Sequence, residues 1–434
     1  MSRDDLQTLP NGGVLSRADI PVLTYADYSE RLLAEIANGG RVAACFADDP
    51  GAGDELDLYA LIARDRQGDL RLLRTRIGDR FASLTPRCTQ LHLFEREIAE
   101  QYGAVPEGHP WLKPVRFHGS WRPGQDAWGR DTDSHPIPGD MDFYRVEGEE
   151  VHEVAVGPVH AGVIEPGHFR FQCHGEEVMH LEISLGYQHR AIERHLIGGP
   201  YPLTPFQLET AAGDTTIGHM TAWCQISEAL AGVSVSSRGD RLRAVALELE
   251  RLANHVGDLG AIAGDVGFLP TASYCGRLRG DYLNLTAELC GSRFGRGLVR
   301  PGGTAFDCDP ALAEKLLKRL EPVERNTRGA IELMFDTPSV LARLEGTGKI
   351  SVETALELGL VGVAARACDL RRDVRLNHPV GIWRDSFNPI PHEESGDVFA
   401  RASIRLKEIY ASLAWIRKQL RELPAGPHCT PVPP

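Results

Sequence analysis

Two segments decide the fold of this chain: GPVHAGVIEPGHFRF (residues 157–171) and ETAAGDTTIGHMTAWCQ (residues 209–225). Around the first, the runs VHEVAVGPVHAG (151–162), HFRFQC (168–173) and EVMHLEISL (177–185) predict strands, because turn-forming EPG and HGEE separate them. The sequence that follows the second segment is mostly helical in pattern. We therefore expect a β-rich opening that leads into a mainly helical domain.

Long amphipathic helices are predicted downstream of these segments. In residues 242–268 the apolar side chains recur near helical spacing, which predicts one buried stripe made of Leu242, Val245, Leu249, Leu252 and Val256. Residues 395–423 predict another such helix, with Ser395 or Asp397 as its N-cap.

The N-terminal part has a mixed pattern. A helical stretch at residues 25–39 is followed by strand-like runs and then by HLFEREIAEQYGAV (residues 92–105); the strand-like runs are residues 41–47, 56–64 and 70–77. We predict a small α+β domain over residues 21–118. A Gly-, Pro- and Asp-rich linker or partner-contacting loop follows at residues 119–149, and the mainly helical domain covers residues 150–434. The predicted fold class is α+β.

Two helical faces carry charged side chains at regular spacing. In FEREIAE an amphipathic pattern places Phe94, Ile98 and Tyr102 toward the core and Glu95, Glu97 and Glu100 in water. Glu250, Asn254 and Asp258 recur at i, i+4 and i+8, with Arg251 and His255 adjacent. A solvated, salt-bridged face is the simple interpretation of this second set.

Composition excludes several classes of function. The chain has 47 basic against 60 acidic residues and a formal charge of -13, which disfavours binding to nucleic acid or anionic lipid. Its longest uncharged apolar stretches, residues 266–276 and 358–365, are too short to cross a bilayer. The start, MSRDDLQTLPNGG, lacks the pattern of a secretory signal, so we expect reduced cysteines and attachment to a membrane only through protein partners.

The nine cysteines are well separated, and the sequence has no C-x-x-C motif. Neither a zinc knuckle nor a ferredoxin-type iron-sulfur motif is therefore encoded locally. We interpret them as small, buried, reduced side chains: Cys45, Cys88, Cys173, Cys224, Cys275, Cys290, Cys308, Cys368 and Cys429. The sequence also lacks a convincing dinucleotide-binding fingerprint.

Several motifs in a fixed order resemble a redox-subunit family. Residues 157–171 and the following LGYQHRAIER (185–194) resemble the large subunits of membrane-bound, energy-converting nickel-iron hydrogenases of the formate-hydrogenlyase type, and the related quinone-site subunit of respiratory complex I. HLFEREIAEQYG (92–103) with HPWLKPVRFH (109–118) resembles the small complex I subunit that docks on it, so the two would be fused here.

The resemblance covers about residues 25–425 and continues through LERLANHVGDLGAIAGDVGF (249–268), RFGRGLVRPGGTAFD (293–307) and GLVGVAARACDLRRDVR (359–375). The family usually has Ser-Gly where this chain has Cys368 and Asp369, so we expect altered packing of that loop. Charged residues on the Glu250 face are expected, by resemblance, to link the redox cavity to the membrane arm.

The resemblance also implies that the nickel site is lost. In the hydrogenases a Cys-Gly-x-Cys stretch follows a Glu by three residues; here Glu209 is present, but the cysteine positions carry Ala212 and Thr215. A C-terminal Asp-Pro-Cys-x-x-Cys closes the hydrogenase site, whereas this chain has PAGPHCTPVPP with the single Cys429. Because nickel and iron in such a site need soft thiolates, we expect no nickel and no metal site in this chain.

In the complex I branch, a His in the first strand-turn region and a Tyr on the following helix bind the quinone head group. Here His160 and His168 flank the EPG turn, but alignment on AWCQISE (222–228) places Gly213 at the Tyr position and Ala212 at the neighbouring acidic position. We expect His168, His160 and Glu209 to be catalytic. An acceptor cavity would include His219, Asp214 and Glu165, with Thr215, His189 and Arg190 nearby.

Two functional hypotheses follow from the resemblance. The first is a large-subunit-like component of a membrane-associated, ion-translocating NADH-quinone-oxidoreductase-type or hydrogenase-related complex, peripheral on the cytoplasmic face of the inner membrane. It would hold no cofactor firmly, and a quinone is the candidate for a bound molecule. Its partners would be an iron-sulfur small subunit and antiporter-like membrane subunits. The second is a non-catalytic assembly or coupling subunit, in which the polar side chains of the old cavity merely bond to one another.

Overall fold

In the computed structural model the chain folds into two compact units. The described residues are 7–51, 53–131, 135–160, 165–386 and 389–433. The first unit contains Met1–Thr8, Leu15–Arg64 and Leu70–Ala191, and the second contains Leu9–Val14, Asp65–Asp69 and Ile192–Pro434. The α+β class is confirmed. The predicted domain limits at residues 118 and 149 stay predictions, because a unit defined by contacts and a domain defined by a family need not end at the same residue.

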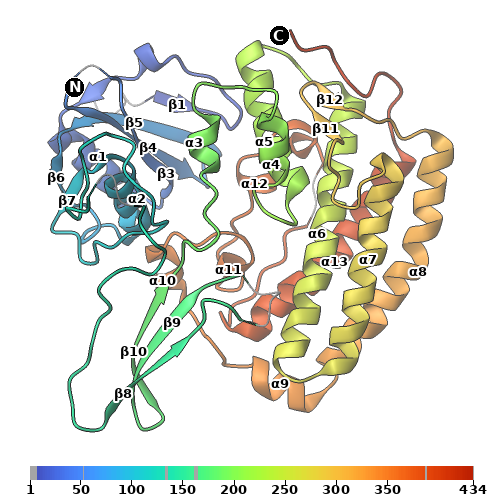
Figure 1. Cartoon of the computed structure of the whole chain (residues 1–434). Helices are drawn as coiled ribbons and strands as arrows, with labels where there is room; N and C mark the ends of the chain where they lie inside the picture. Colours follow the sequence, from blue (N-terminus) through green and yellow to red (C-terminus); the bar gives the residue numbers. More distant parts are fainter. Residues whose placement is uncertain (1–6, 52, 132–134, 161–164, 387–388, 434) are drawn as a thin grey trace. The chain divides into compact units, whose positions relative to one another are not determined.

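A mixed sheet with two helices forms the core of the first unit (Figure 1). Its strands are β1 (Gln7–Leu9), β2 (Val22–Leu23), β3 (Arg41–Asp48), β4 (Leu56–Arg64) and β5 (Asp69–Ile77), in the order β1-β5-β4-β3 with β2 beside β5. Helices α1 (Tyr25–Ala37) and α2 (His92–Tyr102) contact this sheet. Tyr28, Leu32, Ile62, Leu73 and Ile98 are fully buried between these layers. The predicted helices and strands of this part are confirmed.

The acidic face of α2 is not in water. Glu95 is 3% exposed, and its carboxylate accepts hydrogen bonds from the backbone N–H of Leu84 and from the hydroxyls of Ser83 and Thr85. Glu100 is 1% exposed and accepts from three successive backbone N–H groups, at residues 115, 116 and 117. The prediction for these two carboxylates was wrong, because connecting loops fold over the helix and present backbone donors that only a carboxylate satisfies.

A smaller antiparallel sheet follows, in the order β10-β9-β8. Its strands are β8 (Val151–Val156), β9 (His168–His174) and β10 (Glu177–Ser184), which confirms the three strands predicted here. Residues 161–164 of the opening segment lie outside the described residues. Gly175, with φ +59°, permits the tight connection between β9 and β10. The short strands β6 (Arg80–Ala82) and β7 (Val105–Glu107) pair in parallel.

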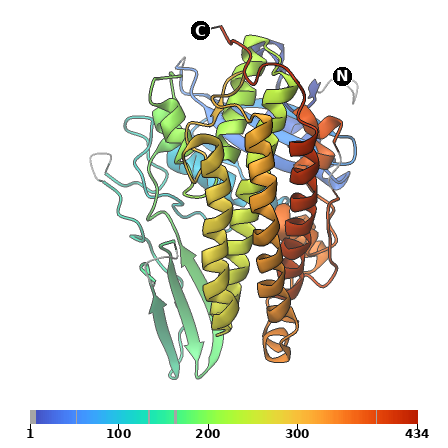
Figure 2. The same cartoon turned by 90° about the vertical axis from the view of Figure 1, so that its right-hand side faces the viewer.

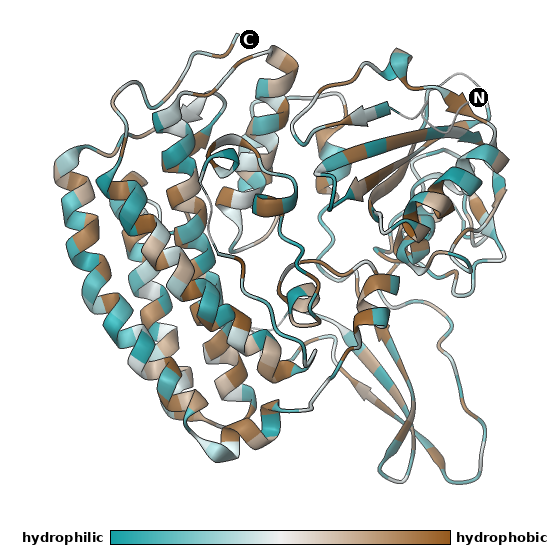
Figure 3. Ribbon diagram, turned by 180° about the vertical axis from the view of Figure 1, so that it is seen from behind, coloured by the Kyte–Doolittle hydropathy of each residue, from teal (hydrophilic) through white to brown (hydrophobic). Residues whose placement is uncertain are grey.

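Four long helices form the core of the second unit and lie side by side in Figures 1 and 2. They are α6 (Ser237–Asp265), α7 (Leu269–Cys290), α8 (Pro310–Phe335) and α13 (Val398–Arg421). The predicted stripe on α6 is confirmed, because all five of its side chains are buried. Asp397 caps α13 by accepting the N–H of Ala400 at 2.8 Å. Hydrophilic and hydrophobic residues alternate along these helices (Figure 3), as amphipathic packing requires.

Shorter elements surround this bundle. They are α3 (Ile192–Leu196), α4 (Thr204–Glu209), α5 (Thr216–Ala231), β11 (Val299–Arg300), β12 (Gly303–Thr304), α9 (Pro338–Leu344), α10 (Val352–Glu357), α11 (Gly362–Arg366) and α12 (Val374–Asn377). Seven of the nine cysteines are buried, as predicted, but the prediction was wrong for Cys290 and Cys429, which are half-buried. Among the described residues, no helix is both long and apolar enough to cross a membrane.

The departure at Cys368 and Asp369 has a visible structural consequence. Asp369 lies in the left-handed region at φ +59°, where Gly would meet no steric cost, and its N–H donates to the carbonyl of Glu393 at 2.7 Å. The Cys368 side chain is buried, with Sγ 3.3 Å from the carbonyl oxygen of Ala364. The loop therefore keeps a glycine-like backbone at a position that carries a side chain.

We predict that Glu100→Gln lowers the free energy of unfolding of the first unit by about 2 to 3 kcal/mol, because an amide cannot accept from three backbone donors as a carboxylate does. Urea unfolding followed by tryptophan fluorescence measures this, since Trp121 contacts Tyr102 at the end of α2. Glu97→Gln on the half-buried face is the control. Equal small effects of both substitutions would contradict the assignment.

Candidate functional site

The predicted site residues are divided between the two compact units, and each set is described by itself. The first unit holds His160, Glu165 and His168, and the second holds Glu209, Asp214 and His219. A single cavity shared by all six therefore stays a prediction.

The two histidines of the first unit are held by the backbone on either side of the EPG turn. A ring nitrogen of His160, Nε2, lies 2.9 Å from the carbonyl oxygen of Gly167. His168 begins β9, and its Nε2 accepts a hydrogen bond from Arg170 at 3.3 Å, while its Nδ1 faces the carbonyl of Gly157 at 3.4 Å. Phe143 packs edge-on against its ring. His168 is thus half-buried and oriented, whereas Glu165 is exposed.

Glu209 ends α4 and is 3% exposed. Its carboxylate accepts from the backbone N–H of Gly297 at 2.8 Å and from the guanidinium of Arg300 at 2.9 Å. This carboxylate therefore holds the hairpin of β11 and β12 against α4. The contacts favour a structural role for Glu209.

The loop between α4 and α5 is held from α6. Thr215 precedes α5 without forming a side-chain cap, so the first N–H groups of that helix need another acceptor. Glu250 of α6 supplies it, because its carboxylate accepts from Ile217 at 2.7 Å and Gly218 at 3.1 Å. Asn254, one turn further along α6, donates to the carbonyl of Asp214 at 3.1 Å. The α6 face that was predicted to be solvated is therefore solvated only in part, because Glu250 and Asn254 contact this loop and the start of α5.

The environment of Glu250 alters its acidity. Burial raises the pKa of Glu250 to about 7, and the nearby Asp214 acts in the same direction, although the two backbone N–H groups oppose them. A carboxyl group with such a pKa is partly protonated at neutral pH. Near neutral pH it therefore occupies both protonation states, whereas an ordinary glutamate is almost fully ionised.

A hollow of about 380 Å³ lies beside this carboxyl group, and we call it the α5–α6 hollow. Its lining consists of Thr215, Gly218, His219, Leu247, Glu250, Arg251, Asn254 and His255. Two buried lining atoms, Oγ1 of Thr215 and Nδ1 of His255, have no hydrogen-bond partner among the residues that the structure describes. Of the six predicted site residues, His219 lines the α5–α6 hollow. Thr215, which was expected near the acceptor cavity, lines it as well.

A buried ion network lies behind the α5–α6 hollow. Glu248 of α6, 0% exposed, accepts from Arg251, Arg375 and Ser412. Glu408 of α13 accepts from His255 at 2.6 Å and from Arg366 at 2.7 Å. Asp373 bonds both Arg366 and Arg375, so the network joins α6, α11, α12 and α13.

The network determines the protonation states of Glu408 and His255. Burial alone would raise the pKa of Glu408, but the hydrogen bond from His255 and the charges of Arg251 and Arg366 outweigh burial and lower it to about 2. Burial lowers the pKa of His255, although Glu408 acts in the opposite direction. At neutral pH Glu408 is therefore ionised and His255 is neutral.

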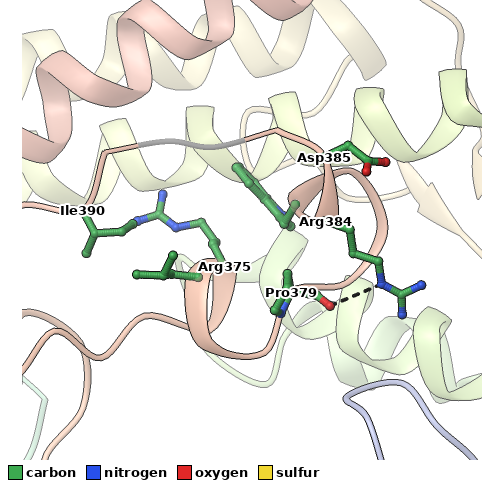
Figure 4. A pocket seen from close by; sticks show the side chains of 7 residues that line it. Arg375, Pro379, Arg384, Asp385 and Ile390 are labelled. Atoms are coloured by element: carbon green, nitrogen blue, oxygen red, sulfur yellow. Dashed lines mark hydrogen bonds between the residues drawn. The ribbon is translucent and has the colours of Figure 1, made fainter. Parts of the chain in front are cut away.

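A second hollow, of about 240 Å³, is lined in part by Arg375. Figure 4 shows Arg375 and Ile390 on one side and Arg384 and Asp385 on the other, with the guanidinium of Arg384 directed away from Arg375 toward the carbonyl of Pro379. Arg375 is already bonded to Asp373 and Glu248. This hollow therefore presents few polar groups that are free to bind a ligand.

Sequence reasoning missed Glu250 and His255 as site residues. The signal was present, because both belong to the charged α6 pattern, but the sequence does not show what lies opposite them. In the part of the chain that is described, no three His, Cys, Asp or Glu side chains are gathered as a metal ion requires. The expected absence of nickel stays a prediction.

Comparison with known proteins agrees with the fold. Residues 265–433 match the family described as the 49 kDa subunit of respiratory-chain NADH dehydrogenase. The D-type subunit of NADH-quinone oxidoreductase from Flavobacterium johnsoniae is 30% identical over 285 residues, covering 64% of this chain and 68% of that protein. The chain therefore belongs to the family of these D-type subunits, and the resemblance inferred from its motifs is confirmed.

Two further relatives extend this finding. The C/D-type subunit of NADH-quinone oxidoreductase from Bdellovibrio bacteriovorus is 24% identical over 403 residues, covering 88% of this chain and 70% of that protein. Formate hydrogenlyase subunit 5 of Escherichia coli is 29% identical over 360 residues, covering 80% of this chain. This chain spans only 63% of the length of that hydrogenlyase protein. The relatives are thus subunits of oxidoreductase complexes.

We predict that Glu209→Gln lowers the free energy of unfolding by about 1 to 3 kcal/mol. The substitution removes the negative charge that accepts hydrogen bonds from the guanidinium of Arg300 and the backbone N–H of Gly297. Thermal and urea unfolding of the purified chain measure the loss, with exposed Glu345→Gln as control. Unchanged stability, combined with a large loss of turnover in the assembled complex, would instead establish the catalytic role expected from the sequence.

Proposed function

We propose that this chain is the large-subunit-like component of a membrane-associated, ion-translocating complex of the NADH-quinone-oxidoreductase or hydrogenase-related type, without a nickel-iron centre. The proposal rests on the composition of the loop between α4 and α5, in a chain that belongs to this family. Its scaffold is held in place by Glu209 and Glu250, while its two candidate ligand positions carry Ala212 and Thr215.

The side chains of this loop do not fit a nickel-iron centre. Ala212 has no donor atom, and Thr215 offers only a hydroxyl, which is a hard ligand. The cysteines next along the chain are Cys173 and Cys224, both buried. Burial raises the pKa of the Cys224 thiol to about 12, which disfavours the thiolate that a metal requires.

The acceptor that we propose is a quinone. The features that support it are the names of the D-type relatives and the two oriented histidines of the first unit, of which His168 is the stronger candidate. When bound, a quinone would accept electrons, and this chain would orient it and supply protons. NADH would be oxidised on another subunit, because this chain lacks a dinucleotide fingerprint, and the iron-sulfur clusters would belong to a partner subunit.

The second candidate function is a non-catalytic assembly or coupling subunit. A specific observation favours it: Glu209 and both histidines of the first unit already have partners within the protein. In this case the chain would sit between an iron-sulfur subunit and antiporter-like membrane subunits on the cytoplasmic face of the inner membrane. It would transmit conformational change rather than bind an acceptor.

We predict that the complex purified from native membranes contains no stoichiometric nickel and takes up no hydrogen with viologen dye, because two ligand positions lack thiols. Elemental analysis and a hydrogen-uptake assay measure this. Mass spectrometry of the same sample identifies the co-purifying subunits, among which we expect iron-sulfur and membrane partners. Stoichiometric nickel would refute the proposed loss of the metal, and a free monomer would refute the assignment to a complex.

We predict that His168→Gln slows quinone reduction by the assembled complex roughly a hundredfold while its melting temperature stays nearly constant, the scale expected for loss of a positioned proton donor. His174→Gln is a matched control, because His174 lies at the other end of β9 and pairs with exposed Glu150. A lower melting temperature with full turnover would favour the coupling subunit instead.

A further inference from the structure

The α5–α6 hollow brings together two groups whose proton affinities are shifted in opposite directions. Glu250 and His255 project from one helix, five residues apart, and both line the hollow. Burial raises the pKa of the carboxyl group and lowers that of the imidazole. Such a pair departs from the usual order, in which a glutamate is charged and a histidine is close to protonation at neutral pH.

The tautomer of His255 follows from its partner. Glu408 is held by Arg366 and Arg375 and remains ionised, so its carboxylate can only accept a hydrogen bond. Nε2 of His255, 2.6 Å away, must therefore carry the proton. The other nitrogen, Nδ1, then has a lone pair and is the buried atom without a partner among the described residues. His255 is 7% exposed, and its hydrogen bond with Glu408 orients the ring.

The position of Glu250 complements this acceptor. Its two oxygens accept the first N–H groups of α5, and the oxygen that stays unprotonated keeps its hydrogen bond, so the carboxyl group remains anchored when it carries a proton. Thr215, whose Oγ1 is also buried without a partner among the described residues, lines the same hollow and can both donate and accept. A hydroxyl group that can carry a proton therefore lines the same hollow as Glu250.

We propose that Glu250 and His255 form a proton-exchange pair, in which Glu250 delivers a proton through the α5–α6 hollow to Nδ1 of His255 by way of water or a hydroxyl group. The O–H bond of Glu250 breaks, an N–H bond forms on His255, and the imidazolium remains paired with Glu408. The proton-exchange pair deepens the proposed function. It rests on that function only in one respect, namely that the transferred proton is used in turnover.

The buried ion network gives the transferred proton a consequence. Before transfer, its carboxylates Glu248, Asp373 and Glu408 balance the guanidinium groups of Arg251, Arg366 and Arg375. A proton on His255 adds one positive charge to this balanced set. The charge change reaches α13 directly, because Glu408 belongs to that helix.

The charged groups that face the pair come from three elements. Asp214 precedes α5, and His219 lies on it. Arg251 lies between the pair on α6, and Glu408 and Arg405 approach from α13. Arg251 and Arg405 oppose a positive charge on His255, whereas the ionised Glu408 favours it, so the protonated state of His255 depends on Glu408.

The test uses the purified full chain and needs no turnover. Nitrogen NMR of chain labelled in its histidines should include, at pH 7, a signal from a histidine with Nε2 protonated and Nδ1 bare that vanishes in His255→Gln. Infrared spectroscopy should show a carboxylic acid that titrates near pH 7 and is absent from Glu250→Gln. The exchange rate of His255 between its neutral and charged forms should fall roughly tenfold or more in Glu250→Gln.

Matched variants guard against a general effect of substitution. Thr221→Val removes a buried hydroxyl from α5 outside the hollow and should leave the exchange rate unchanged. Glu250→Asp keeps a carboxyl group and should therefore retain part of the exchange rate. This variant tests the pair even where Glu250→Gln folds poorly. A proton on Nδ1 at pH 7, a titration of Glu250 near 4.5 or an unchanged rate in Glu250→Gln overturns the proposal.

Turnover of the assembled complex separates this inference from the proposed function. With the pair in place, quinone reduction should fall above about pH 7, where Glu250 loses its proton, and Glu250→Gln should abolish that limb of the profile. A complex that reduces no quinone refutes the proposed acceptor. The NMR and infrared results still decide, in either direction, whether the pair exchanges a proton.

Discussion

The ion pairs of Glu248 and Glu408 with Arg375 determine the arrangement of the second unit. Charges taken out of water are tolerated only when each has a well-placed partner, and removal of one partner leaves a costly unpaired charge. Glu248 comes from α6, Arg375 from α12 and Glu408 from α13, so the three segments can satisfy one another only in one register. Packing of apolar stripes alone would permit neighbouring registers of these helices.

The position of α6 then defines the candidate site. Because Glu248 is fixed in the network, the same helix presents Glu250, two residues further on, to the start of α5, and Asn254, one turn after Glu250, to the carbonyl of Asp214. The unusual acidity of Glu250 is a result of this position, since the helix that orients the carboxyl group also buries it. Structural and chemical roles are thus combined in one side chain.

The elements could be predicted from the sequence because their periodicity is a local property. Burial of Leu242, Val245, Leu249, Leu252 and Val256 follows directly from helical spacing. The same reasoning failed for Glu95 and Glu100, whose backbone donors come from connecting loops. Glu250 was recognised as part of a pattern but not as a site residue, because its partners are backbone N–H groups, which carry no sequence signal. His168 and Glu209 could be chosen from motifs alone, but their partners could not.

The loop between α4 and α5 explains how a chain can keep this scaffold without thiol ligands. In a metal site, ligand bonds hold such a loop to its surroundings. Here Glu209 bonds Gly297 and Arg300 on one side, and Glu250 and Asn254 hold the loop and the start of α5 on the other. Ala212 and Thr215 lie between these two anchors, so neither is needed to keep the loop in place. Thiol side chains at residues 212 and 215 are therefore not needed to hold this loop, and the hollow beside Thr215 is lined by the carboxyl group of Glu250 and the imidazole of His255.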